Sequence, residues 1–287
     1  MSEIATSPGT RRGLTAFFLL LVVFLYAPIV ILAVFSFNEG DVSFPLAGFT
    51  LDWYRRFFEN PKILQSLERS AIVAAVSSTI AVALGVSAAI ALVRRKFAGK
   101  SAVSALVFSP LVVPYLVFGV SLLVIFTTVD KFLTSTTGQY IGLGLHAIVI
   151  GHVVVSLPYT MLTIIPLLER LNVGLEEAAK DLGASPWNSF RRVTFPLLMP
   201  ALVSAFMIAF TLSFDEFAIA SFVADSSAPT WPVYLFAQLR VPSQLPQLLA
   251  VSSVVLVVSL IVVIAAEIGR RIAERRYGGD APLQNLP

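Results

Sequence analysis

The sequence predicts an all-α, polytopic membrane protein with six transmembrane helices. Hydrophobic residues make up 57% of the chain and charged residues only 13%, whereas an ordinary globular domain carries about 25% charged residues. The apolar runs are continuous rather than alternating, which favours membrane helices over a β-barrel. The chain has no cysteine, which excludes disulfides, thiolate metal sites and cysteine nucleophiles.

The six expected spans follow from the thickness of the bilayer. A helix needs about 20 apolar residues to cross about 30 Å of hydrocarbon. Six stretches are long enough, at about 14–37, 68–93, 102–127, 142–168, 200–224 and 248–268. We therefore expect one six-helix transmembrane domain at 14–268, between an N-terminal tail at 1–13 and a C-terminal tail at 269–287.

The first apolar run is interpreted as a retained helix. It is longer than the hydrophobic region of a signal peptide and lacks a clear exit of small residues. A cleaved signal is the alternative. The loop that follows, 38–67, is expected to contain a short interfacial helix near Leu51–Phe58, with Trp53 and Tyr54 at the level of the headgroups.

The basic residues orient the bundle, because loops on the cytoplasmic side carry an excess of Lys and Arg. With the N-terminus inside, 14 of the 20 basic residues fall on the inner side and 6 on the outer side. Both termini and the loop at 169–199 are then expected to face the cytoplasm.

The inner loop at 169–199 predicts two short helices. Leu175–Leu182 consists mostly of good helix formers and has acids near its start, where the helix dipole favours them. Gly183 suits a helix C-terminus, and Pro186 suits the first position of a second helix. On composition alone, a plain amphipathic linker lying on the bilayer explains the same residues equally well.

The spacing in this loop resembles the EAA loop of ABC importer permeases, whose pattern is E-A-A-x3-G-x9-I-x-L-P. Here Glu177-Ala178-Ala179 is followed by Gly183 and then by 193–196, where Val and Phe replace the usual Ile and Leu. The resemblance implies that 176–186 forms a coupling helix docked in a groove of a separate ATPase. The residues implied in this contact are Glu176, Glu177, Ala178, Ala179, Gly183, Ala184, Pro186 and Pro196.

Nearly the whole chain is similar to the second membrane subunit of spermidine/putrescine importers, notably LSFDEFAIASFV at 212–223 and TWPVYLFAQLR at 230–240. This resemblance implies a type I ABC importer permease fold in the bacterial inner membrane. It implies three protein partners: a related second permease, an ABC ATPase dimer that binds ATP and Mg²⁺, and a periplasmic binding protein. The chain itself is then expected to be neither an enzyme nor a cofactor or nucleic-acid binder. Another cationic or organic solute stays open, as does a homodimeric pair.

Two adjacent acids, Asp215 and Glu216, fall inside the expected fifth span. A charge in the membrane costs at least about 2.5–3.5 kcal/mol, so such residues normally face a cavity or a partner. We expect a carboxylate here to attract a cationic substrate, with aromatic rings assisting through cation–π contact. The expected pathway residues are Asp215, Glu216, Trp231, Tyr234 and Tyr115. Which acid faces the pathway stays open, and the alternative is an acid that holds two permease subunits together.

Other signals are weak. Gly99-Lys100-Ser101 resembles the end of a phosphate-binding loop, but that pattern needs glycine where Arg94 stands. His146 and His152 are six residues apart, so neither zinc nor another metal is expected.

Two rival hypotheses are a proton-driven secondary transporter with Asp215 or Glu216 as relay, and an intramembrane enzyme using the same pair. Only an importer permease is expected to co-purify with an ATPase.

Overall fold

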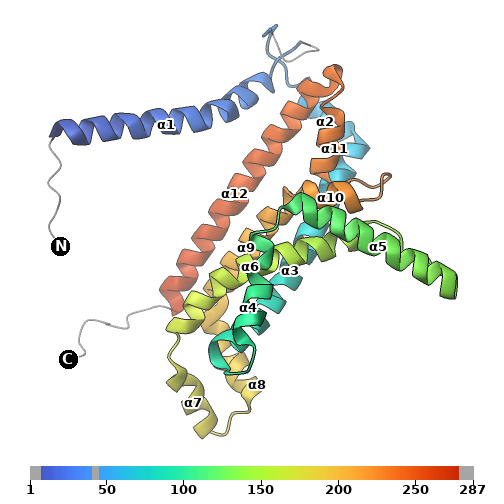
Figure 1. Ribbon diagram of the computed structural model, residues 1–287. Helices are drawn as coiled ribbons and strands as arrows, with labels where there is room; N and C mark the ends of the chain where they lie inside the picture. The colour runs from blue at the N-terminus through green and yellow to red at the C-terminus, as the bar shows by residue number, and fades with distance from the viewer. Residues whose placement is uncertain (1–7, 41–44, 278–287) are drawn as a thin grey trace. The chain divides into compact units, whose positions relative to one another are not determined.

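The computed structural model describes residues 8–40 and 45–277 (Figure 1). The expected tails include residues 1–7 and 278–287, which lie outside the described residues. The described chain is helical, apart from loops and one isolated antiparallel bridge between Asn38 and Phe49. Six of its helices are long and apolar enough to cross a membrane, which agrees with the predicted number.

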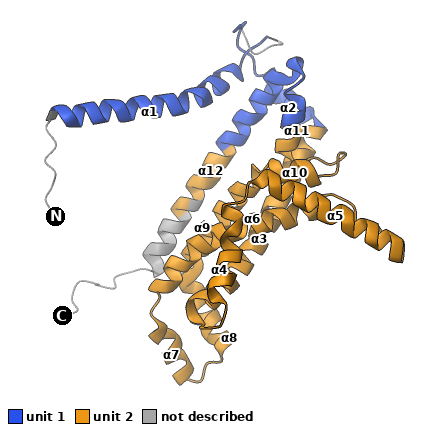
Figure 2. Cartoon of the chain, in the orientation of Figure 1, with its two compact units in different colours: residues 1–61, 236–257 blue, residues 62–235, 258–287 orange. Residues whose placement is uncertain are grey.

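The chain divides into two compact units (Figure 2). The first comprises Met1–Pro61 and Phe236–Val257, and the second comprises Lys62–Leu235 and Val258–Pro287. The first unit contains α1 (Pro8–Phe35) and α2 (Asp52–Glu59), together with parts of α11 (Trp231–Gln238) and α12 (Leu245–Tyr277).

Helix α2 confirms the short helix predicted near Leu51–Phe58. Its Trp53 is buried within the first unit, where the indole N–H donates to the carbonyl of Asn38 at 2.7 Å. The Asn38 side chain in turn donates to the carbonyl of Pro45 and accepts from the backbone N–H of Ala47. These bonds hold the chain that leaves α1 against α2.

The second unit is a helical bundle that also contains the two short helices of the loop at 169–199. Its helices are α3 (Pro61–Arg94), α4 (Lys100–Phe108), α5 (Tyr115–Thr137), α6 (Leu145–Arg170), α7 (Val173–Asp181), α8 (Pro186–Ser189), α9 (Phe195–Phe214) and α10 (Ala218–Val223). One buried cluster joins Ala89 of α3, Ile164 and Leu168 of α6, and Leu198 and Ala205 of α9. Small residues at such positions let membrane helices approach closely.

The predicted third span, 102–127, is wrong in its bounds. The chain forms the short helix α4, a single 3-10 turn at Ser109–Leu111, and then α5, which continues to Thr137 through most of the expected loop. Pro114 is the reason: it precedes α5 with φ −58° and ψ 134°, outside the helical region. A proline also pushes the residue before it out of the helical region, which ends the preceding helical segment.

The predicted fifth span, 200–224, is not continuous. Helix α9 ends at Phe214, and a separate helix, α10, begins at Ala218. The Glu216 side chain lies at this break and accepts from the backbone N–H groups of Ile219 and Ala220, at 2.8 and 3.0 Å. An acceptor at this position satisfies N–H groups that a helix start leaves without partners.

Replacement of Gly119 by valine is expected to destabilise the protein. A Cβ added at Gly119 would lie 3.1 Å from the carbonyl oxygen of Ala218 and from the Cα of Ile219, both in the backbone of α10. Such overpacking typically costs about 1–3 kcal/mol. The midpoint of thermal unfolding measures the effect. Gly13→Ala is the control, because nothing lies within 4 Å of its added Cβ, and equal midpoints for the two variants would contradict the α5–α10 packing.

Candidate functional site

The coupling loop (residues 172–194) has the two predicted helices. The Asn172 side chain caps α7 by accepting from the N–H of Gly174 at 2.9 Å. Gly183 ends the helix in the left-handed region at φ +84°, which favours glycine. The Ser185 hydroxyl then caps α8 by accepting from the N–H of Asn188. A π-helical turn at Phe190–Thr194 leads into α9.

Glu176 connects the coupling loop to two long helices. Its Oε1 accepts from the Thr194 hydroxyl at 3.1 Å and pairs with Nη2 of Arg94, the last residue of α3, at 3.5 Å. The same Nη2 donates to the carbonyl of Leu171 at 3.3 Å. These contacts join α7 to the end of α3 and to the residue that precedes α9. Sequence reasoning did not identify Arg94 as a contact of this loop.

The opposite side of the coupling loop is exposed and partly apolar. Glu177 and Ala178 are exposed, and Leu182 is 90% exposed, the highest value among the large hydrophobic residues of the described chain. Trp187 is also exposed, at 65%. Sequence reasoning missed Leu182, although an apolar residue between Asp181 and Gly183 in a polar loop was the available signal. Among the other residues predicted to contact the ATPase, Gly183 and Pro186 are exposed. Ala179, Ala184 and Pro196 are half-buried.

A chain of buried polar side chains crosses the centre of the second unit. The Ser77 and Ser213 hydroxyls are 2.8 Å apart, and Ser213 Oγ lies 2.7 Å from Nδ1 of His152. Nε2 of His152 lies 3.1 Å from Oε2 of Glu216. With neutral His152, Nε2–H donates to the Glu216 carboxylate and Nδ1 accepts from the Ser213 hydroxyl. The chain links α3, α6 and α9 to the start of α10.

Ser213, His152 and Glu216 are the residue types of a catalytic triad, but they are closed to any substrate. Ser213, His152 and Glu216 are 4%, 2% and 7% exposed, so a substrate cannot reach the hydroxyl. The geometry therefore supports a structural role and gives no support to an intramembrane enzyme. The other histidine, His146, contacts the carbonyl of Gly142. No group of three potential metal-ligating side chains occurs within residues 8–40 and 45–277.

The two adjacent acids have different surroundings. Asp215 is exposed, and no described residue forms a hydrogen bond or an ion pair with its carboxylate. Glu216 is buried with both oxygens occupied. Of the pair, Asp215 alone can receive a cation without breaking existing bonds.

The predicted aromatic partners lie mostly inside the unit. Trp231 and Tyr234 are buried, and their ring centroids are 6.2 Å apart. The backbone N–H of Trp231 donates to the Ser70 hydroxyl at 2.8 Å. Tyr115 is half-buried and bonds to the Tyr159 hydroxyl at 3.2 Å.

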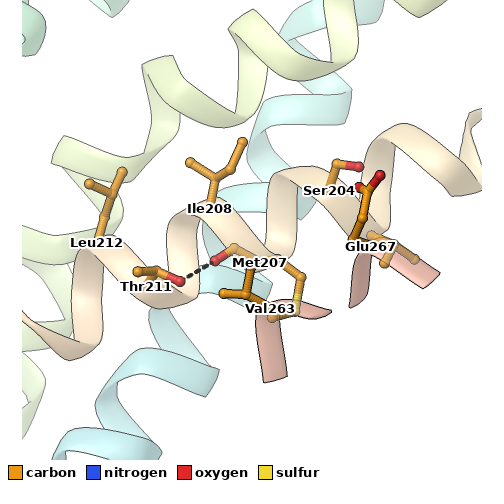
Figure 3. A pocket seen from close by; sticks show the side chains of 8 residues that line it. Ser204, Met207, Ile208, Thr211, Leu212, Val263 and Glu267 are labelled. Atoms are coloured by element: carbon orange, nitrogen blue, oxygen red, sulfur yellow. Dashed lines mark hydrogen bonds between the residues drawn. The ribbon is translucent and has the colours of Figure 1, made fainter. Parts of the chain in front are cut away.

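An apolar groove of about 480 Å³ lies between α9 and the second-unit part of α12 (Figure 3). Its lining includes Ser204, Met207 and Thr211 on α9 and Val263 and Glu267 on α12. Asp215 follows Thr211 by four residues, so it lies about one turn further along the same face.

Residues 81–278 match the family model described as the binding-protein-dependent transport system inner membrane component. The chain is 35% identical over 257 residues to the spermidine/putrescine transport system permease protein PotC of Shigella flexneri, covering 90% of this chain and 93% of that protein. It is also 35% identical to the putrescine transport system permease protein PotI of Escherichia coli (strain K12), covering 81% and 82%.

Two solved structures show the same fold. A chain of a bacterial ABC transporter involved in the import of the acidic polysaccharide alginate is similar with a TM-score of 0.73 and 14% identity, covering 91% of this chain and 94% of that chain. A chain of the MetNI methionine ABC transporter, in inward-facing conformations, is similar with a TM-score of 0.55 and 20% identity, covering 74% and 95%.

Proposed function

Because the chain belongs to the family of binding-protein-dependent transport system inner membrane components, we propose that it is one of two permease subunits of a polyamine importer. The chain is the transmembrane permease component of a binding-protein-dependent ABC transporter and not its ATPase. Family membership implies an ATPase and a periplasmic binding protein as partners. The proposed second permease is a related but distinct chain.

The proposal of a polyamine substrate rests mainly on the relatives. Proteins 35% identical to this chain over most of its length are permeases for spermidine and putrescine, or for putrescine. Polyamines carry several ammonium groups, and an exposed carboxylate near the end of a membrane helix suits such a cation. Asp215 provides that carboxylate.

The proposed mechanism is alternating access driven through the coupling loop. In the proposed orientation, with both termini in the cytoplasm, the exposed side of α7 and α8 contacts the ATPase. ATP binding closes the ATPase dimer and displaces α7. The Glu176 contacts with Arg94 and Thr194 then pull the ends of α3 and α9, which opens the pathway outward. The ligand shifts this equilibrium only as far as it binds the two states with different affinity.

Replacement of Asp215 by asparagine is expected to raise the KM for spermidine uptake at least tenfold. An ion pair 4 Å apart at an effective dielectric constant of about 20 contributes up to about 4 kcal/mol, and tenfold in affinity is about 1.4 kcal/mol. Uptake of labelled spermidine by the complete transporter in proteoliposomes measures the change. Asp215→Glu keeps the charge and is expected to retain most of the affinity. An unchanged KM in Asp215→Asn would remove the electrostatic proposal.

The substrate and the energy source are tested in the same assay. Unlabelled putrescine and spermidine are expected to compete with labelled spermidine for uptake, whereas amino acids are not. Competition by another cationic or organic solute alone would replace the polyamine proposal while leaving the permease role intact. Uptake that persists without the ATPase subunit would instead favour a proton-coupled secondary transporter. Co-purification of a distinct second permease tests the heterodimer.

A further inference from the structure

A second cavity, of about 500 Å³, lies where α3 and α6 meet the coupling loop. One part of its lining is hydrophobic and comes from the long helices, with Val86, Ile90 and Leu168. Another part is basic, with Arg94, Arg95 and Lys180. This division into an apolar part and a cationic part is typical of a site for an amphiphile with a negatively charged head.

The charge balance of the cavity is positive. Glu176 is the one acid in the lining, and it is already paired with Arg94. The charges of Arg95 and Lys180 therefore remain in excess. In addition, Nε of Arg94 is buried and has no hydrogen-bond acceptor among the described residues. A buried donor without an acceptor is unfavourable, so an oxygen ligand at this position is favoured.

The depth of the cavity distinguishes a lipid from a soluble anion. Val86 precedes Arg94 by eight residues in α3, which is about 12 Å along the helix axis. The apolar lining thus reaches well into the membrane-spanning part of α3, whereas the basic lining lies at its end.

We propose that this cavity binds one anionic phospholipid from the leaflet on the side of the coupling loop. The phosphate lies at Arg94, Arg95 and Lys180, and an acyl chain lies along Val86 and Ile90. Basic pockets between membrane helices bind anionic headgroups in this way. The bound lipid stabilises the contact between Arg94 and Glu176. Its binding does not depend on which solute the transporter carries.

The test is native mass spectrometry of the purified complete transporter, titrated with phosphatidylglycerol. One saturable lipid per chain is expected, with phosphatidylcholine binding weakly. A surface charge contributes about 1 kcal/mol to such binding, so the double variant Arg95→Gln/Lys180→Gln is expected to bind phosphatidylglycerol about 30-fold more weakly. The matched control Lys96→Gln/Lys100→Gln removes two charges just after Arg95, at residues that do not line the cavity.

Three results would overturn the proposal. The first is equal loss of affinity in the two double variants, which would indicate general attraction to the membrane surface. The second is binding of glycerol phosphate as tight as that of the whole lipid, which would indicate a soluble anion. The third is binding of phosphatidylglycerol only after the ATPase has been removed, which would indicate that the partner protein fills the cavity. Ile90→Trp, which fills the apolar part, is expected to abolish lipid binding while the complex remains assembled.

Discussion

Replacement of Leu182 by aspartate is expected to separate the permease from its ATPase. Leu182 is 90% exposed on the coupling loop, next to the glycine turn that ends α7. Burying a leucine in a partner's groove contributes about 1.5–3 kcal/mol, and aspartate would in addition place a charge there. We expect at least a 30-fold weaker complex, equivalent to about 2 kcal/mol, and near loss of ATP-driven uptake.

The measurements are co-purification of the ATPase and spermidine uptake, made together with thermal unfolding of the permease. Because Leu182 contributes so little buried area to its own chain, the midpoint of unfolding is expected to stay unchanged. Leu182→Met keeps the apolar contact and is expected to behave like the original chain. Normal ATPase recovery and uptake in Leu182→Asp would show that this side of the coupling loop is not the docking surface.

Replacement of Glu216 by alanine is expected to be the most destabilising change in the second unit. It removes the acceptor for the N–H groups of Ile219 and Ala220 and leaves His152 without its carboxylate partner. Each buried donor left without an acceptor typically costs about 1–3 kcal/mol, and Ile219, Ala220 and His152 each lose one acceptor. Low yield and a lowered midpoint of unfolding are the expected results.

A series of Glu216 and His152 variants tests whether the role of Glu216 is structural. Glu216→Gln is expected to be milder, because its carbonyl oxygen still accepts from Ile219 and the His152 tautomer can adapt. The double variant His152→Ala/Glu216→Ala is expected to lose less than the sum of the single losses, since the two residues share one contact. A Glu216→Ala permease of normal stability that fails to transport would instead support the pathway role that the sequence indicates.

Much of the architecture was predictable from the sequence, because hydropathy and breaker residues act locally. The number of long apolar helices, the two helices of the coupling loop and the turn at Gly183 are confirmed. The family that the spacing of Glu177, Ala178 and Gly183 indicates is confirmed by the match over 81–278. The orientation in the membrane, the ATPase contacts and the pathway residues stay predictions.

The breaks in the third and fifth spans were not predictable from hydropathy. Val113 and Pro114 lie inside an apolar run, and hydropathy reports the length of such a run but not its continuity. The break at 215–217 depends on a side-chain cap at the start of α10 and on His152, 64 positions away in the chain. Contacts at that separation leave no periodic signal in either segment.

The sequence by itself determined the six long apolar helices of the described chain and the two short helices at 172–194, since both properties follow from residue types at short spacing. The tertiary structure alone decided which member of each acidic pair faces inward. Glu176 is tied to Arg94 while Glu177 is exposed, and Glu216 is buried with His152 while Asp215 is exposed. In α7, adjacent residues point about 100° apart, and only the packing against α3 and α9 selects Glu176 as the inward residue. Asp215 and Glu216 lie in the break between α9 and α10, where the contacts with His152, Ile219 and Ala220 hold Glu216 inside.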